Sequence, residues 1–169
     1  MSATSIRPAY STWPRFNSAL RDSVATLTPE QLGLTPAPGR WPLWATVGHL
    51  ACQRVFWLCD AAGEPGAETT PFPNAGFDCP GDDDLEHVLG PDQLVVALDS
   101  TFAIVAERLD RWTLPMLAEE IRHPDWEPDW AYTRGEILQR VFAHDVYHAA
   151  EANETLSRAG LPVVDLWSW

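Results

Sequence analysis

Residues 133–160 read TRGEILQRVFAHDVYHAAEANETLSRAG, and this stretch decides the fold class. Thr133 and Glu136 have the spacing of a capping box, in which the two side chains satisfy free backbone N–H groups at the start of a helix. Gly160, with Pro162 just beyond it, is a typical helix stop. The sequence therefore predicts one long helix between Thr133 and Gly160.

Three further helices are expected upstream. Over Pro14–Leu27 and Pro91–Trp112 apolar residues recur with the three-to-four-residue spacing of one helix face. Pro42–Ala61 is apolar on most of its circumference, as expected of a helix that is buried on most sides. A short helical turn is expected after the first helix, because Thr28 and Gln31 also have capping-box spacing. No convincing alternating strand pattern competes with these segments. The chain is therefore predicted to be an all-α four-helix bundle.

Two long irregular connections, residues 62–90 and 114–132, separate the helices. The first is rich in Gly, Pro and acidic residues, and connections of this length are usually functional or mobile. Short strands inside either connection are compatible with its composition. The C-terminal segment 163–169, VVDLWSW, is too apolar to remain in water. We expect it to pack on the bundle or on a second subunit.

Size and composition are those of one domain that covers residues 1–169. The chain has a mass of 18.8 kDa and is 46% hydrophobic, which is enough to bury a core. No apolar run approaches the roughly 20 residues of a membrane-spanning helix. Residues 1–16 lack the unbroken apolar stretch of a secretory signal. We therefore expect a cytoplasmic protein with no membrane partner.

Charge and reactive side chains exclude several classes of function. The net charge is −13, so no basic stripe is available for phosphates, and a nucleic-acid partner is not expected. All 11 basic residues are Arg, which excludes a Lys nucleophile or Schiff base. Cys52, Cys59 and Cys79 are odd in number and lack CxxC spacing, so they fit reduced thiols better than a disulfide framework.

The strongest chemical signal is a pair of His residues in the fourth helix. His144 and His148 are four residues apart, which places both imidazoles on one helix face with about 5–6 Å between their Cβ atoms. Two ring nitrogens at this spacing can bind one metal ion. Ile137 and Val141 continue the same stripe, so the pair faces the core.

His49 extends an apolar face of the second helix in the same way. A lone His of this kind is more often a hydrogen-bonded core residue than a ligand. Three imidazoles buried in a small core without partners are costly, however, and a shared metal ion would satisfy all three. We therefore predict a metal site formed by His49, His144 and His148. Three protein ligands leave a coordination position open, as in catalytic sites.

The segments Trp44–Leu50, WATVGHL, and 133–148 resemble the DinB/YfiT-like superfamily of bacterial metal-binding four-helix proteins. Gly160-Leu-Pro162 closes the last helix as in many members of that superfamily. The resemblance extends over nearly the whole chain through helix order and ligand placement. It implies an up-down-down-up bundle, a Zn, Ni or similar divalent site at one end, and frequent homodimers.

The same resemblance implies a class of reaction. Relatives include mycothiol-dependent maleylpyruvate isomerase and bacillithiol transferases, so it implies a thiol-dependent S-transferase or isomerase that acts on a small-molecule substrate. The metal would bind an external low-molecular-weight thiol or water, and no Cys of the chain would be the nucleophile. Some relatives have Glu where this chain has His144, and a neutral all-His ligand set leaves the metal more positive.

Three other functions remain open at this point. The open site could instead activate water, which would make the protein a metal-dependent hydrolase. The protein could also bind a metal ion without catalysis, for example as a stress-linked sensor or an interaction module. The His cluster could also hold no ion, in which case the bundle would serve only for dimerisation.

Two charged residues near the predicted site have alternative interpretations. Glu151, three residues after His148, is either an acceptor for an imidazole N–H, a catalytic general base, or an exposed carboxylate. Arg54 is either a buried clamp for a carboxylate, as in cofactor binding, or part of a surface salt bridge.

The remaining candidates have simpler interpretations. Asp145 is expected just outside the ligand set or at the surface. Tyr147 could lie near the mouth of the bundle, but a buried aromatic residue is favoured. Cys52 could supply a thiolate ligand, but a small core residue is favoured. His87 and His123 lie in polar connections and are expected to be solvated. Five Trp residues are expected either as pocket walls or as core: Trp41, Trp44, Trp57, Trp126 and Trp130.

Overall fold

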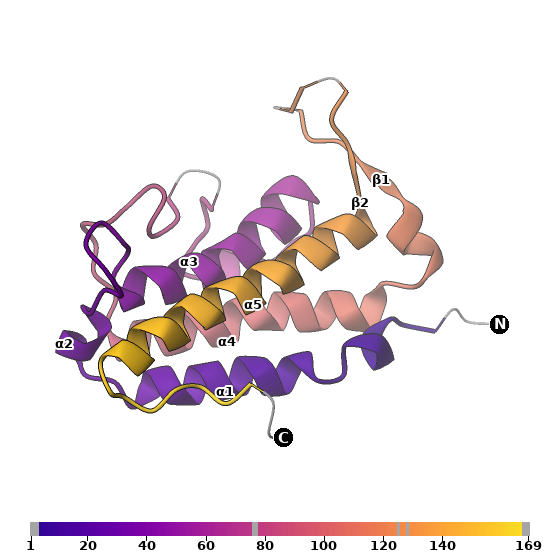
Figure 1. The fold of residues 1–169 in the computed structure, drawn as a ribbon. Coiled ribbons are helices and arrows are strands. Elements are labelled where there is room, and N and C mark those ends of the chain that lie inside the picture. The colour runs from indigo at the N-terminus through magenta and orange to yellow at the C-terminus, as the bar shows by residue number, and fades with distance from the viewer. Residues whose placement is uncertain (1–3, 76–77, 125, 128, 167–169) are drawn as a thin grey trace.

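The structure is a computed structural model that describes residues 4–75, 78–124, 126–127 and 129–166. Four long helices form a bundle (Figure 1): α1 (Trp13–Ala25), α3 (Leu43–Val55), α4 (Pro91–Arg111) and α5 (Arg134–Arg158). α1 and α5 run in one direction, and α3 and α4 run in the other. α3 packs against both α4 and α5, while α1 packs against α4. The predicted all-α bundle with up-down-down-up connectivity is confirmed.

Shorter elements join and extend these helices. α3 continues without a break into the π-helical segment η2, so together they cover the single helix predicted from Pro42 to Ala61. The strands β1 and β2 pair antiparallel inside the second long connection, with Glu120 opposite Thr133. The short elements are η1 (Arg7–Tyr10), α2 (Pro29–Leu32), η2 (Phe56–Ala61), η3 (Ala67–Thr69), η4 (Pro115–Ala118), β1 (Glu120–Ile121) and β2 (Tyr132–Thr133).

Both predicted capping boxes are present. The Thr28 hydroxyl accepts the Gln31 backbone N–H, and the Gln31 side chain accepts the Thr28 backbone N–H in return. Thr133 and Glu136 make the same reciprocal pair at the start of α5. At the other end of α5, Gly160 has a φ of 67°, a left-handed conformation that stops the helix. The helix that carries two of the predicted ligands therefore has well-defined ends.

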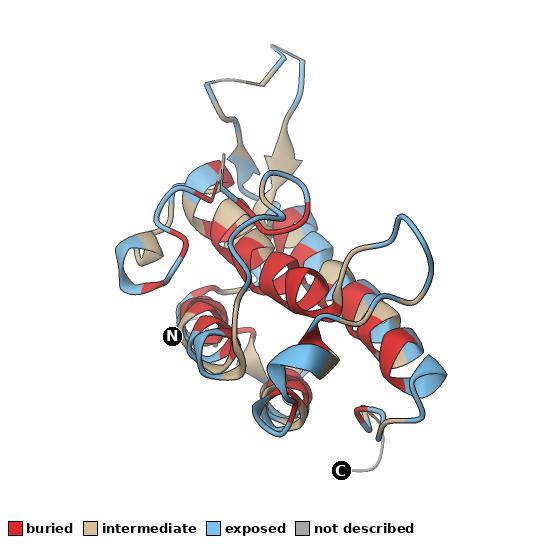
Figure 2. Cartoon of the chain, turned by 90° about the vertical axis from the view of Figure 1, so that its left-hand side faces the viewer, coloured by how far each residue is buried: buried red, intermediate tan, exposed pale blue. Residues whose placement is uncertain are grey.

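The core lies between the inner faces of the four helices, where buried residues gather in Figure 2. α3 is its most enclosed helix, because every residue from Leu43 to Val55 except Gln53 is buried. A helix that is apolar on most of its circumference is buried on most sides, as the sequence predicted. His49, the predicted ligand on α3, is therefore carried by a helix that is packed on nearly all sides.

Cys52 and Cys79 form a disulfide bond, so the prediction of three reduced thiols is wrong. Cys59 alone keeps a free thiol. The error arose because the bond joins α3 to the irregular 62–90 connection across a sequence separation of 27 residues. Neither an odd Cys count nor the absence of CxxC spacing reveals where such a connection folds back.

The described part of the C-terminal segment packs on the bundle, which was one of the two predicted positions for it. Val164 is buried, and its backbone N–H and C=O both pair with the side chain of Asn153 on α5. Trp167 and Trp169 lie outside the described residues. No described helix is long and apolar enough to cross a membrane.

Candidate metal centre

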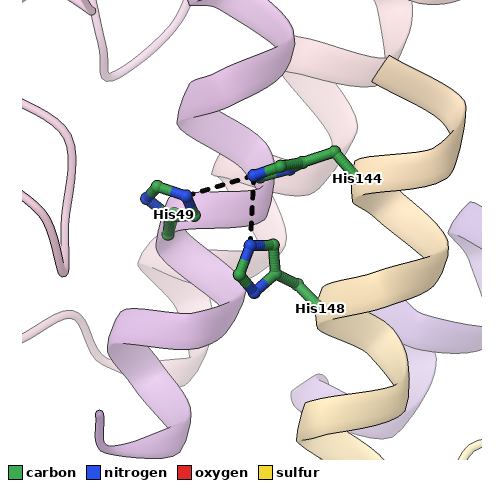
Figure 3. A group of neighbouring side chains, drawn as sticks. All are labelled: His49, His144 and His148. Carbon is green, nitrogen blue, oxygen red and sulfur yellow. Dashed lines mark hydrogen bonds between the residues drawn. The ribbon is translucent and has the colours of Figure 1, made fainter. Parts of the chain in front are cut away.

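Three imidazoles from two helices converge at one point (Figure 3). His49 comes from α3, and His144 and His148 come from successive turns of α5. The Nε2 atom of His144 lies 3.2 Å from that of His49 and 3.1 Å from that of His148. One nitrogen from each ring lies within 4.8 Å of the other two, so the group could hold one metal ion. The structure thus brings together the three residues predicted as ligands.

The environment keeps these imidazoles neutral. Burial lowers the pKa of His49 and His148 from the ordinary value, and it lowers the pKa of His144 to about 3. Repulsion between the neighbouring imidazolium charges is the next cause for His49 and His144. At neutral pH the three rings therefore carry no charge, which is the form that binds a metal ion.

The outer nitrogens of two rings have acceptors, which determines their tautomers. His49 Nδ1 donates to the backbone carbonyl of Pro80 at 3.1 Å, with the Asp82 carboxylate at 3.7 Å. His148 Nδ1 donates to Glu151 Oε2 at 2.8 Å. A neutral imidazole has one N–H and one lone pair, so both Nε2 atoms present lone pairs to His144.

This arrangement leaves the cluster one hydrogen short. His144 Nε2 faces the lone pairs of both other rings, but a single N–H can donate to only one of them. The other lone pair is then left without a hydrogen-bond donor. A cation at the centre would accept the lone pairs of all three rings. The residues present therefore fit a metal ion better than they fit a set of mutual hydrogen bonds.

Of the three predicted ligands, His144 differs in the surroundings of its outer nitrogen. Its Nδ1 atom is buried and has no hydrogen-bond partner among the described residues. Metal-binding His residues usually donate their second N–H to an acceptor that orients the ring. The orientation of His144 therefore depends on packing and on its place in the middle of α5.

Glu151 links the cluster to the solvent side of the site. Besides accepting from His148, its carboxylate forms an ion pair with Arg40 from the segment before α3. The prediction of Glu151 as an acceptor for an imidazole N–H agrees with this contact. Its role as a general base stays a prediction. Arg40 has no sequence signal, since it precedes α3 in a Pro-rich connection.

Arg54 lies in the interior, so its interpretation as a surface salt bridge is wrong. Its Nη2 and Nε atoms donate to Asp145 at 2.8 and 3.0 Å, and its Nη1 donates to Asn17 Oδ1 at 2.8 Å. Trp13 Nε1 donates to the same Asp145 carboxylate at 2.8 Å. Arg54 does clamp a carboxylate, but that carboxylate belongs to Asp145 and not to a cofactor. Asp145 is completely buried, which excludes the surface position considered for it.

A pocket of about 230 Å³ opens beside His148. Trp41 forms one wall, with its ring 4.8 Å from the His49 ring and 6.1 Å from the His148 ring, nearly parallel to the latter. Tyr147 is 59% exposed and lines the same pocket, so the prediction of a buried aromatic residue is wrong. The pocket is lined by Pro36, Gly39, Arg40, Trp41, Thr46, Tyr147, His148, Glu151, Glu154 and Thr155.

The other candidate residues lie outside this cluster. His87 is exposed and pairs with Asp84, as expected for a solvated His. His123 is only 18% exposed in its side chain and faces Asp60 at 3.9 Å, so it is less solvated than expected. The Pro80 carbonyl was missed because a backbone acceptor has no signature in the sequence.

Comparison with known proteins supports the family and the fold. A family model described as the DinB superfamily matches residues 13–152, a range that includes His49, His144 and His148. The crystal structure of a DinB-like protein from Bacillus cereus ATCC 10987 is similar in fold, with a TM-score of 0.71 over 98% of this chain and 99% of that chain. Its sequence is 17% identical, so it supports the fold alone. No curated protein matches this chain.

Proposed function

Because the chain belongs to the DinB superfamily, we propose that His49, His144 and His148 hold one divalent metal ion that serves catalysis on a small-molecule substrate. The observation that carries this proposal is the convergence of three neutral Nε2 atoms, two of which must present lone pairs. Three protein ligands leave a position free for a substrate or cofactor atom. Imidazole ligands suit Zn and Ni among other ions, and these two are our candidates.

The ion would supply Lewis acidity, which lowers the pKa of a thiol or water that it binds. The surrounding residues would orient and bind. Glu151 holds the His148 tautomer, and the Glu151–Arg40 pair forms the polar side of the pocket. Trp41 and Tyr147 offer aromatic surface to an apolar part of the substrate. Glu151 is also our candidate for a general base.

We propose that the reaction is a thiol-dependent S-transfer or isomerisation and that the thiol is external. The chain has no suitable thiol of its own. Cys52 and Cys79 are bonded to each other, and burial raises the pKa of Cys59 to about 11. A thiol with so high a pKa carries almost no thiolate at neutral pH. The resemblance to thiol-dependent members of the superfamily is the second support.

Two further parts of the proposal concern the protein as a whole. We propose a homodimer, on the strength of the family resemblance, and light scattering at tens of micromolar that gives 18.8 kDa would contradict it. We propose a cytoplasmic location. The buried Cys52–Cys79 disulfide argues against this location, because such bonds are uncommon in cytosolic proteins.

The proposal is tested by metal analysis of the purified protein, followed by thermal shifts with a panel of small thiols. We expect close to one Zn or Ni per chain and a rise in the melting temperature with at least one thiol, because a ligand that binds the folded state stabilises it. Retained metal without any response to thiols would favour a non-catalytic metal-binding protein. Absence of metal, even after incubation with Zn and Ni salts, would refute the metal site itself.

A further inference from the structure

The disulfide bond joins the metal site to the long connection that covers it. Cys52 follows His49 by about one helical turn on α3, and Cys79 directly precedes Pro80, whose carbonyl accepts the His49 Nδ1–H. Both Cys residues are completely buried. The covalent bond therefore lies within one residue of the group that orients a predicted ligand.

Residues 79–81 fit closely against α3 and Trp41. A Cβ atom on Gly48 of α3 would lie 3.1 Å from Pro80 Cγ, which is tighter than an ordinary van der Waals contact, so the two segments pack closely. A Cβ atom on Gly81, whose φ is 88°, would lie 2.9 Å from three atoms of the Trp41 ring. The same short segment thus contacts both the helix that carries His49 and the ring that lies over His49 and His148.

On the N-terminal side of this anchor the connection is held by Phe72 and Ala75, which are buried in the core, whereas Asp82 and Asp83 on its C-terminal side are exposed. Residues 82–84 are all Asp. The negative charges of Asp82 and Asp83 favour a higher pKa for His49, but burial has the larger effect and the pKa is lowered. Asp83 is exposed, and its carboxylate accepts the Cys79 backbone N–H at 2.8 Å. Closing a long loop covalently limits the positions open to its residues.

We propose that the Cys52–Cys79 disulfide is a positioning device for the ligand His49. The bond holds the Pro80 carbonyl against His49 Nδ1, and this contact keeps the Nε2 lone pair directed at His144 and the ion. This inference rests on the proposed metal site, and it adds that the affinity of the site for metal depends on the oxidation state of the two cysteines.

The first test compares a Cys52→Ala/Cys79→Ala double variant with the wild type in competition with a chromophoric chelator for Zn. Partners of metal-binding His residues typically contribute roughly 10–100-fold to metal affinity, so we expect a loss in that range. Cys59→Ala is the matched control, since Cys59 is a free cysteine outside the three-His cluster, and we expect no loss. Equal Zn affinity of the double variant and the wild type would overturn the inference but leave the metal site intact.

The second test keeps every native side chain. The metal-free wild type is reduced with dithiothreitol, which gives two electrons and two protons to the Cys52–Cys79 bond and becomes a cyclic disulfide, and is then desalted without oxygen. We expect a 10–100-fold weaker Zn affinity that is restored on reoxidation. An affinity that does not change with oxidation state would refute the inference, whether or not the double variant folds.

The third test needs no metal. Nitrogen-15 NMR of the metal-free protein reports which ring nitrogen of His49 carries hydrogen, with its signal assigned from a His49→Gln variant. We expect the Nδ1–H form in the oxidised protein and a mixture of tautomers in the double variant, while His148 stays in its Nδ1–H form because Glu151 is unaffected. An unchanged His49 tautomer would refute the positioning role. A protein that passes this test but binds no Zn would contradict the proposed function instead.

Discussion

His148 and His49 are supported in different ways. The acceptor for His148 is Glu151, three residues further along the same helix, and the two are joined by one turn of α5. The acceptor for His49 is the carbonyl of Pro80, which lies 31 residues away in an irregular connection. The first contact forms wherever α5 forms. The second exists only while a long connection keeps its place, so we expect the α3 side of the site to be the more easily disturbed.

The largest effect is expected from removing a ligand on the α5 side. His148→Ala deletes one of three nitrogens, so the loss of Zn affinity should exceed the roughly 100-fold that an outer partner can cost. Metal content by mass spectrometry and chelator competition measure it. His87→Ala is the control, because His87 is exposed and lies outside the cluster. Full metal content in the His148→Ala protein would show that this ring is no ligand.

Next in size is an effect on stability from the buried pair beneath the site. Asp145→Ala leaves the guanidinium of Arg54 buried without its carboxylate, which typically costs about 3–5 kcal/mol of folding free energy. Urea unfolding of the metal-free protein measures this loss. Glu154→Ala is the comparison, because it breaks only an exposed pair with Arg158, worth about 0.3–0.5 kcal/mol. Similar losses in the two variants would mean that Asp145 does not anchor α5.

A smaller effect is expected at the local acceptor. Glu151→Ala removes the partner of His148 Nδ1 and should weaken Zn binding about 10–100-fold. The comparison with the disulfide variant sharpens the contrast between the two sides of the site. Reduction should alter the His49 tautomer alone, and Glu151→Ala should alter that of His148 alone. If either change altered both rings equally, the two supports would not be independent.

The smallest effect at neutral pH is a change in the pH dependence of stability, because it develops only below pH ~6.5. In the folded protein burial lowers the pKa of His144 to about 3, whereas an unfolded His titrates near 6.5. Below pH ~6.5 the unfolded chain therefore binds more protons than the folded one, so this contribution to stability is complete above pH ~6.5 and is lost as the pH falls towards 3.

A His144→Gln variant makes this contribution measurable. Urea unfolding of metal-free protein should lose stability more steeply with falling pH in the wild type than in the variant. The difference is at most about 1.4 kcal/mol per pH unit for one group. Parallel curves for the two proteins would show that His144 titrates normally.

The parts of the molecule that the sequence predicted are those that depend on local spacing. The i,i+4 relation of His144 and His148 and the capping box of Thr133 and Glu136 follow from helix geometry alone. His49 could be placed opposite His144 and His148 because it lies on an apolar face of its helix, and that face is expected to point into the core. Each of these features is determined by residues that lie within three or four positions of one another in the sequence.

The parts that were missed depend on where the 62–90 connection runs and on which helix faces meet. The bond between Cys52 and Cys79 and the Pro80 carbonyl both require that path. The partner of Arg54 could not be assigned, because Asp145 lies on another helix. The sequence allowed each of the two residues to lie either at the surface or in the interior. Tyr147 was misassigned because an aromatic side chain next to a ligand can also line a pocket.

The parallel course of α3 and α4 explains why a distant connection reaches the site at all. Antiparallel helices are usually joined by 2–8 residues at one end of a bundle. Here the chain leaves the far end of η2 and must return past both η2 and the 13-residue α3, which alone is about 20 Å long, before α4 can begin (Figure 1). A connection too short for that distance would force α4 to reverse and would change the fold. A connection of the same length but different sequence could present a different wall to the same three imidazoles.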